Sequence, residues 1–126
     1  MLKSVLLVGI GSFFGGALRY AVSLLVKSGC ASSFPWATLA VNLIGCFLIG
    51  VVCALFSRSG AVSQNIFLLL ATGFCGGFTT FSAFANEGLL MLQEWNIASF
   101  LLYAVGSIVI GVALVALGYW IVELLV

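Results

Sequence analysis

The sequence predicts an all-α integral membrane protein with four transmembrane helices, and two observations lead to that fold class. Hydrophobic residues make up 64% of the 126-residue chain and charged residues only 6%, which excludes an ordinary soluble globule. The apolar runs are also continuous, as in "SIVIGVALVAL", whereas barrel strands alternate apolar and polar residues. A span needs roughly 20 apolar residues. We therefore expect one transmembrane domain over 1–126, with spans at 2–26, 36–56, 65–92 and 97–125.

The first predicted span, 2–26, resembles a secretory signal only superficially. Arg19 lies inside it, and no small-residue cleavage site directly follows the apolar run. We therefore expect this segment to be retained as the first transmembrane helix.

The charges of the short loops predict an unusual membrane orientation. Lys3 and Arg58 fall on one side of the bilayer and Lys27 on the other. Because the Lys and Arg asymmetry of short loops sets orientation, this near tie predicts that copies insert both ways. Four helices alone can hardly enclose a polar path through lipid, so we expect an antiparallel homodimer with two-fold symmetry.

The sequence lacks the side-chain combinations that hydrolysis and redox chemistry require. The chain has no histidine and a net charge of +1, and no carboxylate pair sits at helical spacing within one span. An enzyme and a nucleic-acid partner are therefore not expected. The cysteines are interpreted as small buried residues rather than zinc or haem ligands, because no histidine accompanies them; they are Cys30, Cys46, Cys53 and Cys75.

Small residues recur every four positions on the first two spans. Gly11 and Gly15 do so on the first, and Cys46, Gly50 and Ala54 on the second. This spacing places them on one helix face and predicts close helix contacts.

A few polar side chains lie inside the predicted spans, where such groups are costly and often functional. Arg19 either extends to the headgroups or attracts anions into a vestibule. Asn42 lies too deep for a helix cap, so its amide serves either a helix contact or a ligand. Tyr103 and Ser107 share one face of the fourth span and fit either a hydroxyl ladder or packing, while Glu87 ends the polar series of the third span.

The third span contains a sequence that a simple lipid-spanning helix does not need, "TGFCGGFTTFSAF". Its glycines, Gly73, Gly76 and Gly77, each weaken a helix by about 1 kcal/mol relative to alanine. The β-branched pair Thr79 and Thr80 follows directly, so we predict a helix break near Gly76–Thr79. A broken helix in lipid requires its freed backbone groups to be buried or to bind something.

Aromatic residues follow the predicted break. Phe81 and Phe84 are three residues apart and face the same way, and Phe74 and Phe78 continue the stripe backwards. Packing is the usual role of such a stripe. Aromatic ring edges are, however, electropositive, so a ring pair beside the Asn42 amide and nearby hydroxyls is also suited to a small, hard anion.

These segments resemble a known family over nearly the whole chain. "GFCGGFTTFSAF" is similar to the third-helix signature of the small fluoride channels called the Fluc family, "GGALRY" to its first-helix arginine motif, and "WATLAVNLIGCFLIG" to its second helix. The resemblance implies a dual-topology homodimer in a bacterial cytoplasmic membrane, with two fluoride pores that give passive fluoride exit and fluoride resistance.

The resemblance also implies roles for individual residues. A structural sodium ion would be held at the dimer centre by the backbone carbonyls of Gly76 and Thr79 from both subunits, and Arg19 and Glu87 would influence the aqueous ends of the pore. The residues assigned to the fluoride pore are Phe81, Phe84, Asn42, Ser82, Tyr103, Thr80 and Ser107.

The sequence departs from the family pattern at two positions. Ala83 and Ala85 stand where a threonine and a serine are common, so two hydroxyls are missing. We expect the chain either to conduct more slowly or to rely more on Ser82, Thr80 and Tyr103. Two other functions are alternatives to a channel. A small multidrug-type exchanger needs a membrane-embedded carboxylate, and the first span has none. In a non-transporting membrane subunit, the aromatic stripe would serve packing alone.

Overall fold

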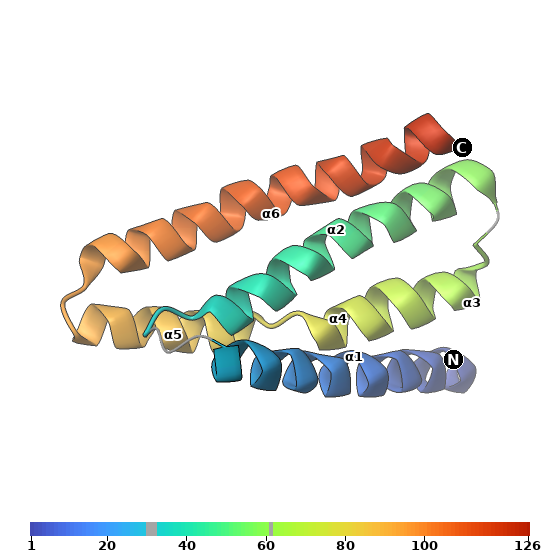
Figure 1. Cartoon of the computed structure of the whole chain (residues 1–126). Helices are drawn as coiled ribbons and strands as arrows, with labels where there is room; N and C mark the ends of the chain where they lie inside the picture. The colour runs from blue at the N-terminus through green and yellow to red at the C-terminus, as the bar shows by residue number, and fades with distance from the viewer. Residues whose placement is uncertain (30–32, 61) are drawn as a thin grey trace.

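The structure is a computed structural model that describes residues 1–29, 33–60 and 62–126, so Cys30 lies outside the described residues. All regular elements in these ranges are helices (Figure 1). They are α1 (Leu2–Gly29), α2 (Trp36–Ser59), α3 (Gln64–Phe67), the π-helix η1 (Leu68–Cys75), α4 (Gly76–Phe78), α5 (Phe81–Gln93) and α6 (Ile97–Leu125). The elements from α3 to α5 together form the third span.

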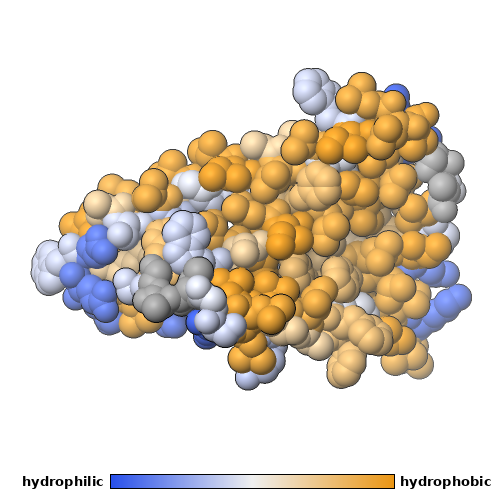
Figure 2. Space-filling view, viewed as in Figure 1, coloured by the Kyte–Doolittle hydropathy of each residue, from blue (hydrophilic) through white to orange (hydrophobic). Residues whose placement is uncertain are grey.

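The described chain contains four helical segments that are long and apolar enough to cross a membrane. Apolar residues cover most of the face shown in Figure 2, and hydrophilic residues gather near its two ends. This distribution matches a hydrocarbon layer between two aqueous surfaces. The predicted all-α membrane fold with four spans is confirmed.

Glycines bring the helices close together. α1 packs along η1 and α4, and α2 packs along α6 (Figure 1). A Cβ atom added to Gly15 would lie 2.2 Å from the carbonyl oxygen of Phe74, and one added to Gly50 would lie 2.2 Å from that of Val115. Only glycine fits such backbone contacts, so the close packing predicted from the small residues is present.

The third span is broken, as predicted. α4 ends at Phe78, and Thr79 and Thr80 are extended, with ψ angles of 160° and 121°, before α5 begins at Phe81. In Figure 1 the chain between α4 and α5 runs without helical turns. The two threonines therefore form the link between the halves of the span.

The glycines have a different role from the one expected. Gly73, Gly76 and Gly77 remain helical, and the break begins at Thr79. The reason is contact with α1: a Cβ atom on Gly73 or Gly77 would lie within 2.8 Å of a backbone oxygen of that helix. Gly73 and Gly77 therefore permit close packing, whereas a Cβ atom on Gly76 would meet nothing within 4 Å. The preceding turns widen into a π-helix that the sequence analysis did not predict.

Candidate functional site

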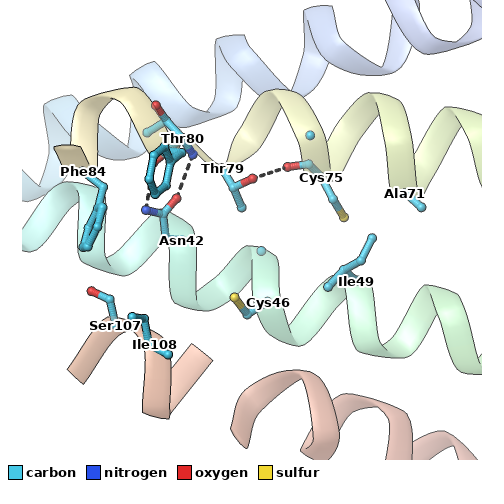
Figure 3. Close-up of a pocket in the computed structure, with 13 residues that line it drawn as sticks. Asn42, Cys46, Ile49, Ala71, Cys75, Thr79, Thr80, Phe84, Ser107 and Ile108 are labelled. Atoms are coloured by element: carbon cyan, nitrogen blue, oxygen red, sulfur yellow. Dashed lines mark hydrogen bonds between the residues drawn. The ribbon is translucent and has the colours of Figure 1, made fainter. Parts of the chain in front are cut away.

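The side chain of Asn42 binds both backbone groups of Thr80 (Figure 3). Its Nδ2 donates to the Thr80 carbonyl oxygen at 3.0 Å, and the Thr80 N–H donates to its Oδ1 at 2.8 Å. The amide thus replaces the helical partners that an extended residue loses. Asn42, on α2, fixes the position of the break.

Two threonines complete the ends of the interrupted helix. The N–H and the hydroxyl of Thr79 both donate to the Cys75 carbonyl oxygen, at 3.0 and 2.9 Å. The hydroxyl of Thr80 accepts from the Ala83 N–H at 3.2 Å, which is the N-cap bond of α5, and lies 3.3 Å from the Ser82 hydroxyl. The break is therefore an ordered feature with defined hydrogen bonds.

The aromatic stripe divides at the break into two ring pairs. Phe74 and Phe78 stack at 5.8 Å, and Phe78 is buried. Phe81 and Phe84 also lie 5.8 Å apart, but Phe81 is 79% exposed in the single chain. Phe84 packs at 4.9 Å against Tyr103 of α6. The first pair belongs to the core, and the second lies at an open surface.

A cavity of about 460 Å³ opens beside the break, between α2, α6 and the third span. It contains most of the residues that the sequence analysis assigned to a site; its lining includes Asn42, Gly76, Thr79, Thr80, Phe81, Phe84 and Ser107 (Figure 3). Apolar residues such as Ile49 and Ile108 form much of the rest. The polar groups of the break therefore face an open and otherwise largely apolar cavity.

Glu87 joins α5 to two other spans. Its Oε1 accepts from the Thr38 hydroxyl at 2.6 Å and its Oε2 from the Tyr103 hydroxyl at 2.9 Å. Tyr103 is thus directed at Glu87, while Ser107, one turn further along α6, lines the cavity. Thr38 was missed by the sequence analysis, although it precedes Asn42 by four residues and so shares its helix face.

Arg19 of α1 binds the third span just before the break. Its Nε donates to the carbonyl oxygen of Gly77 at 3.1 Å, where the helical part before the break ends. A cation is favourable at a helix C-terminus because unpaired carbonyls concentrate negative potential there. The structure therefore gives Arg19 a definite partner in addition to the two alternatives considered from sequence.

Backbone carbonyls are the cation ligands that the break offers. In the described ranges no group of three His, Cys, Asp or Glu side chains could hold a metal. The helix stops after Phe78, and the Thr80 N–H, the helical partner of the Gly76 carbonyl, is bound to Asn42 instead. Gly76 and Thr79 both border the cavity, and carbonyls of unwound helices are known sodium ligands.

The fold and site define an integral membrane protein with a broken helix and a polar site at membrane depth, the features of a channel or transporter. The chain belongs to the family described as CrcB-like protein, Camphor Resistance (CrcB), whose pattern matches residues 6–119. Among its relatives is a protein of Phocaeicola vulgatus, 44% identical, which covers 97% of this chain and 100% of its own length. Another, from Thermus thermophilus, is 45% identical over 94% of each chain. Both relatives bear the name Fluoride-specific ion channel FluC.

Proposed function

We propose that this chain forms a fluoride-selective channel that lets fluoride leave the cell passively. The observation that carries the proposal is the pair of hydrogen bonds by which Asn42 holds the backbone of Thr80 at the helix break, here called the Asn42 clamp. It lies beside the ring pair Phe81 and Phe84, in a chain that belongs to the CrcB-like family. Its relatives from Phocaeicola vulgatus and Thermus thermophilus, named as fluoride-specific channels, support the same ion.

The proposed route uses ring edges and hydrogen-bond donors in place of water. Fluoride passes Phe81 and Phe84, whose rings are 5.8 Å apart, and these rings exclude larger hydrated ions. Asn42 donates one amide hydrogen to the Thr80 carbonyl oxygen, and its second amide hydrogen can bind the ion. Further donors along the route are the hydroxyls of Thr80, Ser82 and Ser107. Tyr103 borders the route with its ring, which packs against Phe84, because its hydroxyl hydrogen is bound to Glu87.

A second copy in the antiparallel orientation completes the pore in this proposal. Phe81 is 79% exposed in one chain, and the polar groups of the break border an open cavity. Polar backbone at membrane depth is tolerated only where protein or water covers it, not lipid. Two copies related by two-fold symmetry would cover both breaks and form two pores.

A structural sodium ion would bind at the centre of this dimer. The carbonyls of Gly76 and Thr79 from the two copies fit it, because the break leaves them without helical partners and beside the cavity. Replacement of sodium by N-methylglucamine is expected to lower both the melting temperature and the fluoride flux. Unchanged values of both quantities in sodium-free buffer would refute the sodium site.

We place the dimer in a bacterial cytoplasmic membrane, where passive fluoride exit would give fluoride resistance. The alternative functions predict a different result in one assay. Purified protein in liposomes is tested for efflux with a fluoride electrode and then with a chloride electrode. The channel releases fluoride rapidly and retains chloride, whereas no release of either ion would favour an exchanger or a non-transporting subunit.

The role of the ring pair is tested by Phe81→Ile, which removes the aromatic edge at similar volume. We expect fluoride efflux to fall by at least about tenfold, because the ion loses a partner that replaces water. Phe13→Ile is the matched control, because Phe13 is also exposed (70%) but lies on α1. Normal efflux through Phe81→Ile would exclude the proposed route.

A further inference from the structure

A second, smaller cavity lies where α1 ends and α2 begins. Its volume is about 250 Å³, and it is more polar than the cavity at the break. α1 contributes Ser23 and Lys27 and α5 contributes Glu87. The rest of the lining comes from Val26, Ser33, Phe34, Pro35, Trp36, Ala37 and Thr38.

Lys27 supplies the positive charge of this cavity. It lies in the last turn of α1, four residues after Ser23 and therefore on the same helix face. Across the described part of the chain, Arg58 and Glu123 form the only ion pair, so Lys27 and Glu87 border one cavity without pairing. Lys27 is exposed and available to an ion from water.

One layer of side chains separates the two cavities. Glu87 borders the smaller cavity and accepts the Tyr103 hydroxyl at 2.9 Å. The Tyr103 ring packs at 4.9 Å against Phe84, which borders the larger cavity (Figure 3 shows Phe84 at its edge). The contacts of Glu87, Tyr103 and Phe84 therefore link the linings of the two cavities.

We infer that the smaller cavity is an anion-binding mouth of the pore, in which Lys27 binds a small, hard monovalent anion before it passes Glu87. The inference rests on the proposed function, since the anion is the one that permeates. Lys27 provides the charge, and the hydroxyls of Ser23 and Ser33 provide donors for a partly hydrated ion.

The charges of the mouth explain why a lysine is needed there. Glu87 would repel an approaching anion, and its two oxygens already accept the hydroxyls of Thr38 and Tyr103. Lys27 offsets that negative charge from the water side and raises the local anion concentration. The effect of such an exposed charge is screened by salt, because the Debye length falls from about 30 Å at 0.01 M to about 3 Å at 1 M.

The first test compares Lys27→Gln and Lys27→Glu with the wild-type dimer in liposomes. At about 20 mM ionic strength we expect fluoride efflux from a low fluoride concentration to fall about threefold in Lys27→Gln and further in Lys27→Glu. At about 500 mM sodium isethionate the three rates should converge. Lys3→Gln is the matched control, because Lys3 is an exposed cation at the other end of α1.

A second test restores or reverses the charge on one folded protein. Lys27→Cys is treated in detergent, before reconstitution, with a cationic or an anionic methanethiosulfonate. The cationic adduct should restore efflux and the anionic adduct should lower it further. Wild-type protein receives the same reagents, as a control for its own cysteines.

The outcomes distinguish failure of the inferred mouth from failure of the proposed channel function. If the wild type releases fluoride rapidly and Lys27→Gln does so at the same rate at low salt, the inference of an anion-binding mouth is wrong, while the channel function stands. Equal effects of the two adducts would lead to the same conclusion. A silent wild type overturns the proposed function and the mouth with it.

Discussion

The two halves of the broken third span differ in what holds them. Before the break, η1 and α4 lie against α1 through backbone contacts at glycines, and the carbonyls of Gly73 and Gly77 accept bonds from Ser12 and Arg19. After the break, side chains hold α5: Asn42 fixes its start, and Glu87 ties it to α2 and α6.

This contrast shows how a membrane protein can form a polar site and still keep its fold. Backbone contacts at glycines bury few polar side chains and tolerate no substitution, so the first half acts as a scaffold. Side-chain contacts leave Phe81 exposed and place hydroxyls at a cavity, so the second half carries the proposed route. Substitutions in the first half should therefore affect folding, and those in the second should affect flux as well.

The largest effect is expected from Gly15→Val, on the face of α1 that packs against the scaffold half. Its Cβ atom would lie 2.2 Å from the Phe74 carbonyl oxygen, a backbone group that can move only with its helix. We expect a loss of at least about 4 kcal/mol in the free energy of unfolding. Size-exclusion chromatography should show little monodisperse protein.

Gly9→Val serves as the matched control on the same helix, because an added Cβ atom meets nothing within 4 Å there. It should elute as the wild type does. Equal behaviour of the two variants would mean that the backbone contact between α1 and η1 does not hold the scaffold half.

Asn42→Ala should have the next largest effect, at the junction of the two halves. It leaves the N–H and carbonyl of Thr80 without their side-chain partners, at a cost of about 3 kcal/mol. Fluoride flux should be lost together with thermal stability. Asn65→Ala, at an exposed amide in the first turn of α3, is the control, and a stable, conducting Asn42→Ala would exclude the clamp.

Much of this comparison could be predicted from the sequence, because apolar runs report membrane spans directly. The break was predicted near Gly76–Thr79 and is observed at Thr79 and Thr80. Its cause was assigned to the glycines together with Thr79 and Thr80, but the glycines remain helical, with Gly73 and Gly77 in contact with α1. Intrinsic helix propensity was overridden by tertiary contact, which one sequence cannot report.

Other parts of the site needed three-dimensional information. The sequence suggested a polar role for Asn42, but its partner Thr80 is 38 positions away. Glu87 and Tyr103 were both candidates, yet nothing in the sequence indicated that they bind each other or that Thr38 joins them. The π-helix η1 was also not foreseen, because an extra residue per turn leaves little trace in an apolar run.

Arg19 offers a smaller test of the scaffold half. Arg19→Gln removes the charge that binds the Gly77 carbonyl, and we expect a loss of about 1.5 kcal/mol in the free energy of unfolding. Arg19→Lys retains a cation and should recover part of that loss. Melting temperatures in detergent measure both variants, and a Gln variant as stable as the wild type would show that the bond contributes nothing.

The smallest effect, and the one most specific to the second half, is expected from Ala83→Thr. Ala83 lies in the first turn of α5, where its N–H is bound to the Thr80 hydroxyl, next to the exposed Phe81. A threonine there adds one of the two hydroxyls that this chain lacks, and a further donor along the route should ease removal of water from the ion.

We expect Ala83→Thr to raise fluoride efflux about twofold, because each added donor lowers the desolvation barrier, with little change in melting temperature. Ala98→Thr, in the first turn of α6, is the matched control and should leave both quantities unchanged. If Ala83→Thr conducts at the wild-type rate, hydroxyl supply does not limit the ion at this position. Selectivity for fluoride would then depend on the ring pair and the Asn42 clamp. The part of the third span that acts on the ion would be limited to residues nearer the break.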